Sequence, residues 1–192
     1  VVPTLLRSLF ELPLRTVQFR RFDSGEGDTQ RFNGNTLSWE TNTSPHAGYW
    51  YRTGRSGRDD TRGYAYEFKD SEPKITGISV NTNKTGQPYV IPWMSDGLHK
   101  ILYDLAEWQI AFNPVSRPIT PTEYLDDLLP DVTVDKFPEI FALFRMPPTP
   151  RNPLPGVPPS HGYVGRAFNI LQMEIERRWN ERNPTERVQL VI

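Results

Sequence analysis

Residues 11–29 read ELPLRTVQFRRFDSGEGDT, and this stretch organises the interpretation of the whole chain. Its first half has the pattern of a short apolar and basic helix. Pro13 suits the first helical position, where its missing N–H group costs nothing. Arg15 then falls in the first turn, beside backbone donors that favour an anion. An acidic turn containing glycine follows at residues 23–28. The stretch therefore predicts a helix start that holds an anion, next to a tight polar turn.

Length and composition limit the class of protein. The chain has 192 residues, so we expect residues 1–192 to form a single domain with a sizeable core. Its net charge is −1, so any contact with nucleic acid must come from local basic patches. The absence of cysteine excludes disulfides, a thiolate nucleophile and a cysteine-ligated zinc site. No signal peptide or apolar run of about 18 residues is visible, so we expect a cytoplasmic protein with no membrane partner.

The pattern of apolar residues predicts helices and short strands. Helical spacing covers residues 3–11, a segment from Ser95 or Asp96 to about Phe112, and a last helix that Ser160 caps. The buried stripe expected on the second of these is Leu98, Ile101, Leu102, Leu105, Trp108 and Phe112, and the apolar stripe expected on the last is Val164, Phe168, Leu171, Ile175 and Trp179. Asn33-Gly34-Asn35 predicts a hairpin turn between residues 29–32 and 36–40. Strands are expected at 64–68, 75–80 and 88–93, the last two forming a hairpin with Lys84 near its tip. The fold class is α+β, a mainly helical domain with a small antiparallel sheet.

Two segments lack a clear apolar period. Residues 41–63 contain four glycines and form a Gly/Arg-rich segment, which we interpret as a mobile loop. Its arginines are candidates for contacts with a DNA backbone: Arg52, Arg55, Arg58 and Arg62. Nearby carboxylates dilute this charge, so a solvated loop is the alternative. Residues 114–160 are interpreted as a proline-rich connection with short helices at 121–129 and 136–142.

Three motifs together resemble a known family. They are Leu14-Arg15 at a helix start, NTNKT at 81–85 followed by YVIPW at 89–93, and LFR at 143–145. The chain resembles the catalytic domain of tyrosine recombinases, or phage-type integrases, over most of its length. More narrowly, it is similar to large integrase-like proteins of bacterial mobile elements. The resemblance implies the recombinase core fold and a role in DNA integration and recombination.

The resemblance also implies roles for individual residues. Tyrosine recombinases break and rejoin DNA by phosphoryl transfer through a phosphotyrosine intermediate. Arg15 matches the first catalytic arginine, which neutralises charge on the phosphate, and Lys84 matches the hairpin lysine, which protonates the departing 5′-oxygen. Glu26 or Asp23 is the candidate for the acidic residue that supports the arginine. The implied partner is double-stranded DNA, with a homo-oligomer on it and neither a metal nor a small-molecule cofactor.

The sequence departs from the family pattern towards its C-terminal end. The family's second half-site is a His-x-x-Arg motif followed by a nucleophilic tyrosine. No histidine follows Trp179, the residue three places after His161 is Val164, and the last tyrosine is Tyr163. We therefore expect a fragment of a longer recombinase, incomplete at the C-terminus and inactive by itself.

Two other classes of function stay open on the sequence alone. The first is a non-catalytic module that binds DNA or protein and retains the recombinase fold. The second is a metal-dependent nuclease using Asp23, Glu26 and Asp28, whose carboxylates suit Mg²⁺. The spacing of these carboxylates does not match an EF-hand loop, because the twelfth position counted from Asp23 is Gly34.

Overall fold

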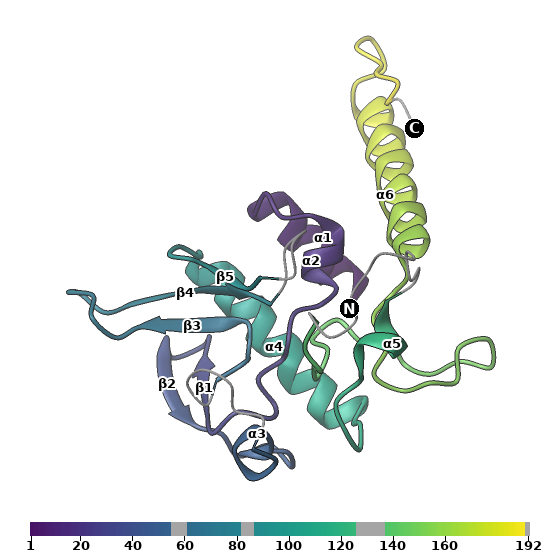
Figure 1. The fold of residues 1–192 in the computed structure, drawn as a ribbon. Helices are drawn as coiled ribbons and strands as arrows, with labels where there is room; N and C mark the ends of the chain where they lie inside the picture. Colours follow the sequence, from purple (N-terminus) through teal and green to yellow (C-terminus); the bar gives the residue numbers. More distant parts are fainter. Residues whose placement is uncertain (55–60, 82–86, 126–136, 191–192) are drawn as a thin grey trace.

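The computed structural model describes residues 1–54, 61–81, 87–125 and 137–190. The helices are α1 (Val2–Glu11), α2 (Thr16–Phe19), α3 (Tyr49–Arg52), α4 (Asp96–Phe112), α5 (Pro121–Tyr124) and α6 (His161–Arg182). The strands are β1 (Gln30–Asn33), β2 (Ser38–Thr41), β3 (Ala65–Phe68), β4 (Ile75–Val80) and β5 (Tyr89–Ile91). The architecture is α+β, as predicted, and Figure 1 shows the strands grouped beside α1, α2 and α4.

The strands form two small antiparallel sheets instead of the single sheet expected. β1 pairs with β2, with Phe32 opposite Trp39, and the connecting turn contains Gly34 as predicted. The other sheet has the order β3-β4-β5, and Ile78 of β4 lies opposite Ala65 on one side and Ile91 on the other. The β4–β5 connection contains residues 82–86, so Lys84 lies outside the described residues.

The main core lies where α1, α2, α4 and β4 meet. Burying apolar side chains supplies the principal stabilisation of such a core. The rings of Phe19 and Phe22 lie 4.9 Å apart between centroids, and Phe144 packs edge-on against Phe19. Leu98 and Leu102 of α4 are fully buried in the same cluster. The short α2 is therefore held by packing, since four residues are too few for a helix to be stable alone.

Helix α4 begins and ends where the sequence predicts. The Ser95 side chain caps it by accepting a hydrogen bond from the Leu98 N–H group, which satisfies one of the open backbone donors. Its buried face was predicted less well. Gln109 is buried on this face, whereas Trp108 and Phe112, which we expected inside, are 40% and 73% exposed. The buried face of α4 is therefore narrower than the stripe of apolar residues along the helix.

Residues 140–145, which read IFALFR, pass through the interior: residues 140–142 are extended, and Leu143 and Phe144 then form a turn. The prediction of a helix over 136–142 is wrong for the part that the structure describes, 137–142. Ala142 forms an isolated bridge with Asp23, and Ile140 forms one with Ile119. A continuous apolar run that is buried on all sides is typical of an interior strand, and Pro138 also opposes a helix.

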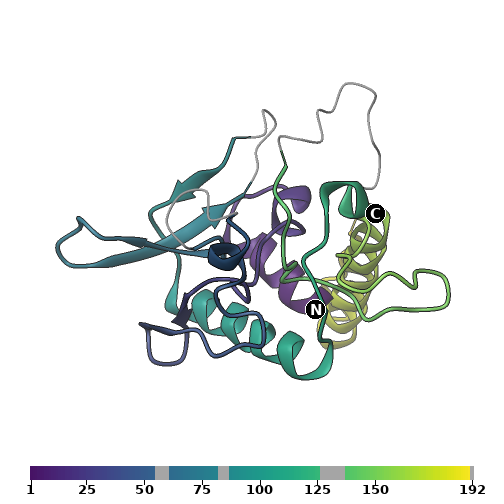
Figure 2. The ribbon, with the colours of Figure 1, turned by 60° about the horizontal axis from the view of Figure 1, so that its bottom comes forward.

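Helix α6 extends away from the rest of the chain (Figure 1), and Figure 2 shows the same helix from another side. The apolar stripe predicted along it is present. Val164 is buried and Phe168 and Leu171 are half-buried, but Ile175 and Trp179 are 50% and 45% exposed. Packing against the body thus covers only the N-terminal part of the stripe.

The described part of segment 41–63 is more ordered than its composition indicates. It contains α3, and Trp50 in that helix is completely buried against Phe141. Asn42 is also buried. Arg55 and Arg58 lie in residues 55–60, outside the described residues.

Candidate nucleic-acid interface

Arg15 is an exposed residue at the start of α2. The helix begins at Thr16, so Arg15 is its N-cap residue and does not lie in the first turn as predicted. Its backbone N–H group donates to Oε1 of Gln18 at 3.0 Å, and its carbonyl accepts from the N–H group of Gln18 at 2.8 Å. These two bonds fix the backbone of Arg15 while its side chain reaches the surface.

Residues 18–21, in and just after α2, form hydrogen bonds with the residues on both sides of the β4–β5 connection. Nε2 of Gln18 donates to the Tyr89 hydroxyl at 2.9 Å, and Nδ2 of Asn81 donates to the Arg21 carbonyl at 2.8 Å. Asn81 directly precedes the stretch 82–86 that contains Lys84, and Tyr89 is the third residue after it. The structure therefore ties the base of the predicted lysine hairpin to the segment that begins with Arg15.

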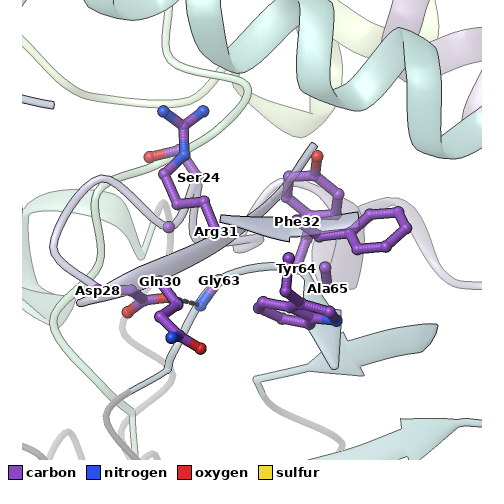
Figure 3. Close-up of a pocket in the computed structure, with 10 residues that line it drawn as sticks. Ser24, Asp28, Gln30, Arg31, Phe32, Gly63, Tyr64 and Ala65 are labelled. Carbon is purple, nitrogen blue, oxygen red and sulfur yellow. Dashed lines mark hydrogen bonds between the residues drawn. The ribbon is translucent and has the colours of Figure 1, made fainter. Parts of the chain in front are cut away.

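The acidic turn after α2 is organised by backbone donors. The two carboxylate oxygens of Asp23 accept from the N–H groups of Gly25 and Phe141, at 2.8 and 2.9 Å. Those of Asp28 accept from the N–H groups of Arg62 and Gly63, both at 2.8 Å; Figure 3 shows the bond to Gly63. The turn thus connects α2 to two distant parts of the chain, residues 62–63 and Phe141.

Burial changes the acidity of these two groups. It raises the pKa of Asp23 to about 7, although the Gly25 and Phe141 N–H groups act in the opposite direction. Burial also raises the pKa of Asp28 well above its ordinary value, and the nearby Asp23 adds to this effect. Desolvation disfavours the charged form of a carboxyl group, which is why both shifts are upward.

Glu26 forms a buried ion pair with Arg145. Its Oε1 lies 2.5 Å from Nη1 of Arg145, and the two side chains are 2% and 0% exposed. Nε of Arg145 also donates to the carbonyl of Asn113, the C-cap residue of α4. Glu26 is therefore the partner of Arg145 and not the support for Arg15 that the resemblance implied; Asp23, the other candidate, binds backbone groups instead.

Sequence reasoning did not predict the role of Arg145. The signal was present, because Arg145 is the only charged residue in the apolar run 140–146. A charged residue in a buried run needs a counterion, since desolvating an unpaired charge is costly. The pattern indicates a buried arginine, but it does not identify Glu26 as the partner.

Two of the four candidate arginines of segment 41–63 can be placed. The guanidinium of Arg62 lies 4.2 Å from the centroid of the Trp50 ring, in a cation–π contact. Arg52, two residues after Trp50 in α3, is exposed and donates to the Ala47 carbonyl. The structure thus brings Arg52 and Arg62 to the same short helix.

The start of α6 lies beside the start of α2. Nε of the buried Arg20 donates to the carbonyl of Pro159, just before α6. Thr16 and His161 line the same hollow of about 240 Å³ between α1, α2 and α6. Arg15 is therefore the sequence neighbour of a residue that lines the hollow between α1, α2 and α6.

The described residues contain no group of three or more His, Asp or Glu side chains arranged to hold a metal ion. The hydrogen bonds of Asp23 and Asp28, together with the ion pair of Glu26, give the three carboxylates of the nuclease alternative another role. They hold separate parts of the chain together. None of the helices in the described parts of the chain is long and apolar enough to cross a membrane.

The fold and this candidate interface define a class of protein: an α+β domain in which an exposed arginine precedes a helix that is hydrogen-bonded to a β-hairpin. Comparison with family models places the chain more closely. Residues 3–122 match the family described as "Putative integrase", and the chain belongs to this family. The matched residues include Arg15, Lys84 and segment 41–63, whereas Arg145 and α6 lie beyond them. No curated protein and no solved structure matches the chain.

Proposed function

We propose that this chain is the DNA-binding part of a site-specific tyrosine recombinase. In this proposal Arg15 and Lys84 grip one phosphate of double-stranded DNA. The observation that carries it is the pair of hydrogen bonds from Gln18 to Tyr89 and from Asn81 to Arg21, which join the two motifs. Membership of an integrase family supports the same function independently.

Covalent geometry limits how far Lys84 can lie from the segment that carries Arg15. Three residues of extended chain span at most about 11 Å, so the Cα atom of Lys84 stays within that distance of the Cα atom of Asn81. Asn81 is itself bonded to Arg21, in the turn after α2. Both cationic side chains are long enough to approach a phosphate placed between α2 and the hairpin.

The proposed chemistry follows from the two kinds of side chain. A guanidinium offers two parallel charge-assisted hydrogen bonds to the non-bridging oxygens of a phosphate. An ammonium group can donate a proton to a departing oxygen. Since the family's second half-site is not found in this chain, we expect DNA binding but no covalent protein–DNA product from the chain alone.

Fluorescence anisotropy with a labelled duplex, measured at several salt concentrations, tests this proposal. Arg15→Ala and Lys84→Ala should each weaken binding and reduce the salt slope by about one unit. If both side chains grip one phosphate, their effects should not add in the double variant. Unchanged affinity in Arg15→Ala would contradict the proposal.

Two variants serve as matched controls. Arg177 of α6 is ion-paired with Glu174 and Glu181, and Lys100 of α4 is ion-paired with Asp104. Arg177→Ala and Lys100→Ala remove the same charges from places away from α2, so they should leave the affinity for the duplex nearly unchanged. A loss as large as that of Arg15→Ala would show that net charge alone determines binding.

A further inference from the structure

A second concave site lies between the two sheets. The β1–β2 hairpin contributes Gln30 and Trp39, and β3 contributes Tyr66 and Glu67, to a hollow of about 290 Å³ that we call the Trp39 hollow. Its volume is close to the lower end for small-ligand pockets. The site is separate from α2, because none of the residues that line it belongs to residues 15–21.

Two aromatic side chains of the Trp39 hollow are held in place by their neighbours. Nε1 of Trp39 donates to Oγ1 of Thr76 at 3.2 Å, and its ring packs against Phe32 at 5.7 Å between centroids. The Tyr66 ring packs against Phe68 at 5.1 Å. Because both rings are already ordered, little conformational entropy is lost when a flat ligand stacks on them.

The polar side chains of the hollow suit the edge of a heterocycle. The Gln30 amide offers both a donor and an acceptor, the Thr61 hydroxyl does the same, and the Glu67 carboxylate accepts. The exocyclic groups and ring nitrogens of a nucleobase present complementary donors and acceptors. The lining therefore combines stacking surfaces with hydrogen-bonding groups.

The charged side chains of the hollow favour a neutral ligand over an anionic one. Glu67 lines the hollow, with Oε1 3.7 Å from Nζ of the exposed Lys74, and its carboxylate would disfavour a phosphate inside the hollow. Lys69, which is exposed, also lines it. A neutral base can thus occupy the interior while a phosphate attached to it remains near the ammonium group of Lys69.

We propose that the Trp39 hollow binds an unpaired nucleobase of the DNA. This inference rests on the proposed function, because it assumes that DNA is the partner, but it concerns other residues than Arg15 and Lys84. It assigns the β1–β2 hairpin and β3 to a single unstacked base. It also gives Trp39 and Tyr66 a role in recognition as well as packing.

The test compares two labelled duplexes that differ by one bulged base. The intact chain should bind the bulged duplex at least about fivefold more tightly, since stacking of one base on an aromatic side chain has an effect of that size or larger. Tyr66→Ala and Gln30→Ala should each reduce this preference while leaving the affinity for the paired duplex nearly unchanged. Gln30 is exposed, so its variant retains the fold even if Tyr66→Ala does not.

Trp108→Ala is the control for removal of an aromatic ring elsewhere, because Trp108 lies on α4 and does not line the hollow. It should preserve the preference. Equal affinities of the intact chain for the two duplexes would overturn this inference and leave the proposed function intact. Failure to bind either duplex would overturn both.

Discussion

Glu26 and Arg145 are separated by 119 positions in the sequence, yet their side chains meet at 2.5 Å in the interior. Neither is in contact with solvent to any important extent. The pair joins the acidic turn after α2 to the end of the buried segment 140–145. Asp23 reinforces the connection through the N–H group of Phe141. These two contacts fix the turn on which the position of the Arg15 segment depends.

Breaking this ion pair should be strongly destabilising. Arg145→Met leaves Glu26 buried without its counterion, and we expect a loss of about 3–5 kcal/mol in the free energy of unfolding. The double variant Glu26→Gln with Arg145→Met buries no unpaired charge and should be more stable than Arg145→Met alone. Urea unfolding of the three proteins measures these differences, and a double variant less stable than the single one would contradict the role assigned to the pair.

Asn42 should be important for the acidic turn. Its Nδ2 group lies within 3.1 Å of the carbonyl oxygens of Gly25, Glu26 and Asp28. Asn42→Ala removes these bonds, while each of the three carbonyls keeps a second donor, so the expected cost is about 0.5–1.5 kcal/mol in unfolding experiments. Asn152→Ala is the control, since Asn152 is exposed and its loss should change stability by less than about 0.5 kcal/mol.

Gly34 allows the β1–β2 turn to approach α4 closely. A Cβ atom at Gly34 would lie 2.4 Å from the carbonyl oxygen of His99, which belongs to the helix backbone and cannot easily move. Gly34→Ala should therefore destabilise the protein by about 1–3 kcal/mol. In α6, a Cβ atom at Gly165 meets nothing within 4 Å, so Gly165→Ala should be neutral or stabilising by up to about 1 kcal/mol. Equal melting temperatures for the two variants would contradict the close approach.

His99 should make the protein sensitive to acid. Burial lowers its pKa below the ordinary value of 6.5, while the Thr76 carbonyl and Asp96 act in the opposite direction. Below pH 6.5 the unfolded chain therefore binds a proton that the folded chain does not, and stability falls as the pH decreases. As the pH is lowered from 7 to 5, the stability of His99→Gln relative to the parent should therefore increase, which urea unfolding of both proteins at each pH measures.

The comparison between variants is necessary because Asp23 acts in the opposite sense. Its pKa is raised to about 7, so its contribution to stability decreases as the pH rises from about 4 to 7. This contribution is present in both proteins and cancels in the difference. An identical pH dependence for His99→Gln and the parent would show that His99 is not buried in its neutral form.

Tyr89 should position the hairpin for DNA binding. Tyr89→Phe removes the hydroxyl that accepts from Gln18 and should weaken duplex binding about two- to tenfold, the effect of one hydrogen bond. Tyr103→Phe is the control, because its hydroxyl bonds to Glu40, away from α2. Anisotropy titrations at one salt concentration measure both. If the two variants bind equally well, the bond between Gln18 and Tyr89 has no part in binding.

Local signals in the sequence predicted the elements well. Ser95 and the stripe that follows it predicted α4, and Ser160 predicted the start of α6, because a cap and a periodic face are properties of neighbouring residues. The turn at Gly34 and the strands on either side were predicted for the same reason. Lys84 lies outside the described residues, so its placement beside Arg15 stays a prediction.

Contacts between distant residues could not be predicted in this way. The apolar run 140–145 has no period that distinguishes a buried strand from a short helix, and its true conformation depends on Asp23 and Ile119. How much of the apolar face of α4 is buried depends on what packs against it. Periodicity alone therefore led us to expect that Trp108 and Phe112 are buried. The partner of Glu26 depends on the tertiary fold.

The ion pair also determines how much of the chain is needed for folding. The residues that match the integrase family end at 122, and Glu26 lies within them whereas Arg145 does not. A protein cut after Thr122 would retain a carboxylate in an apolar interior and lose its counterion, together with the N–H group that binds Asp23. We therefore expect that the boundary of sequence similarity is not a boundary of folding, and that the cooperative unit extends at least as far as Arg145.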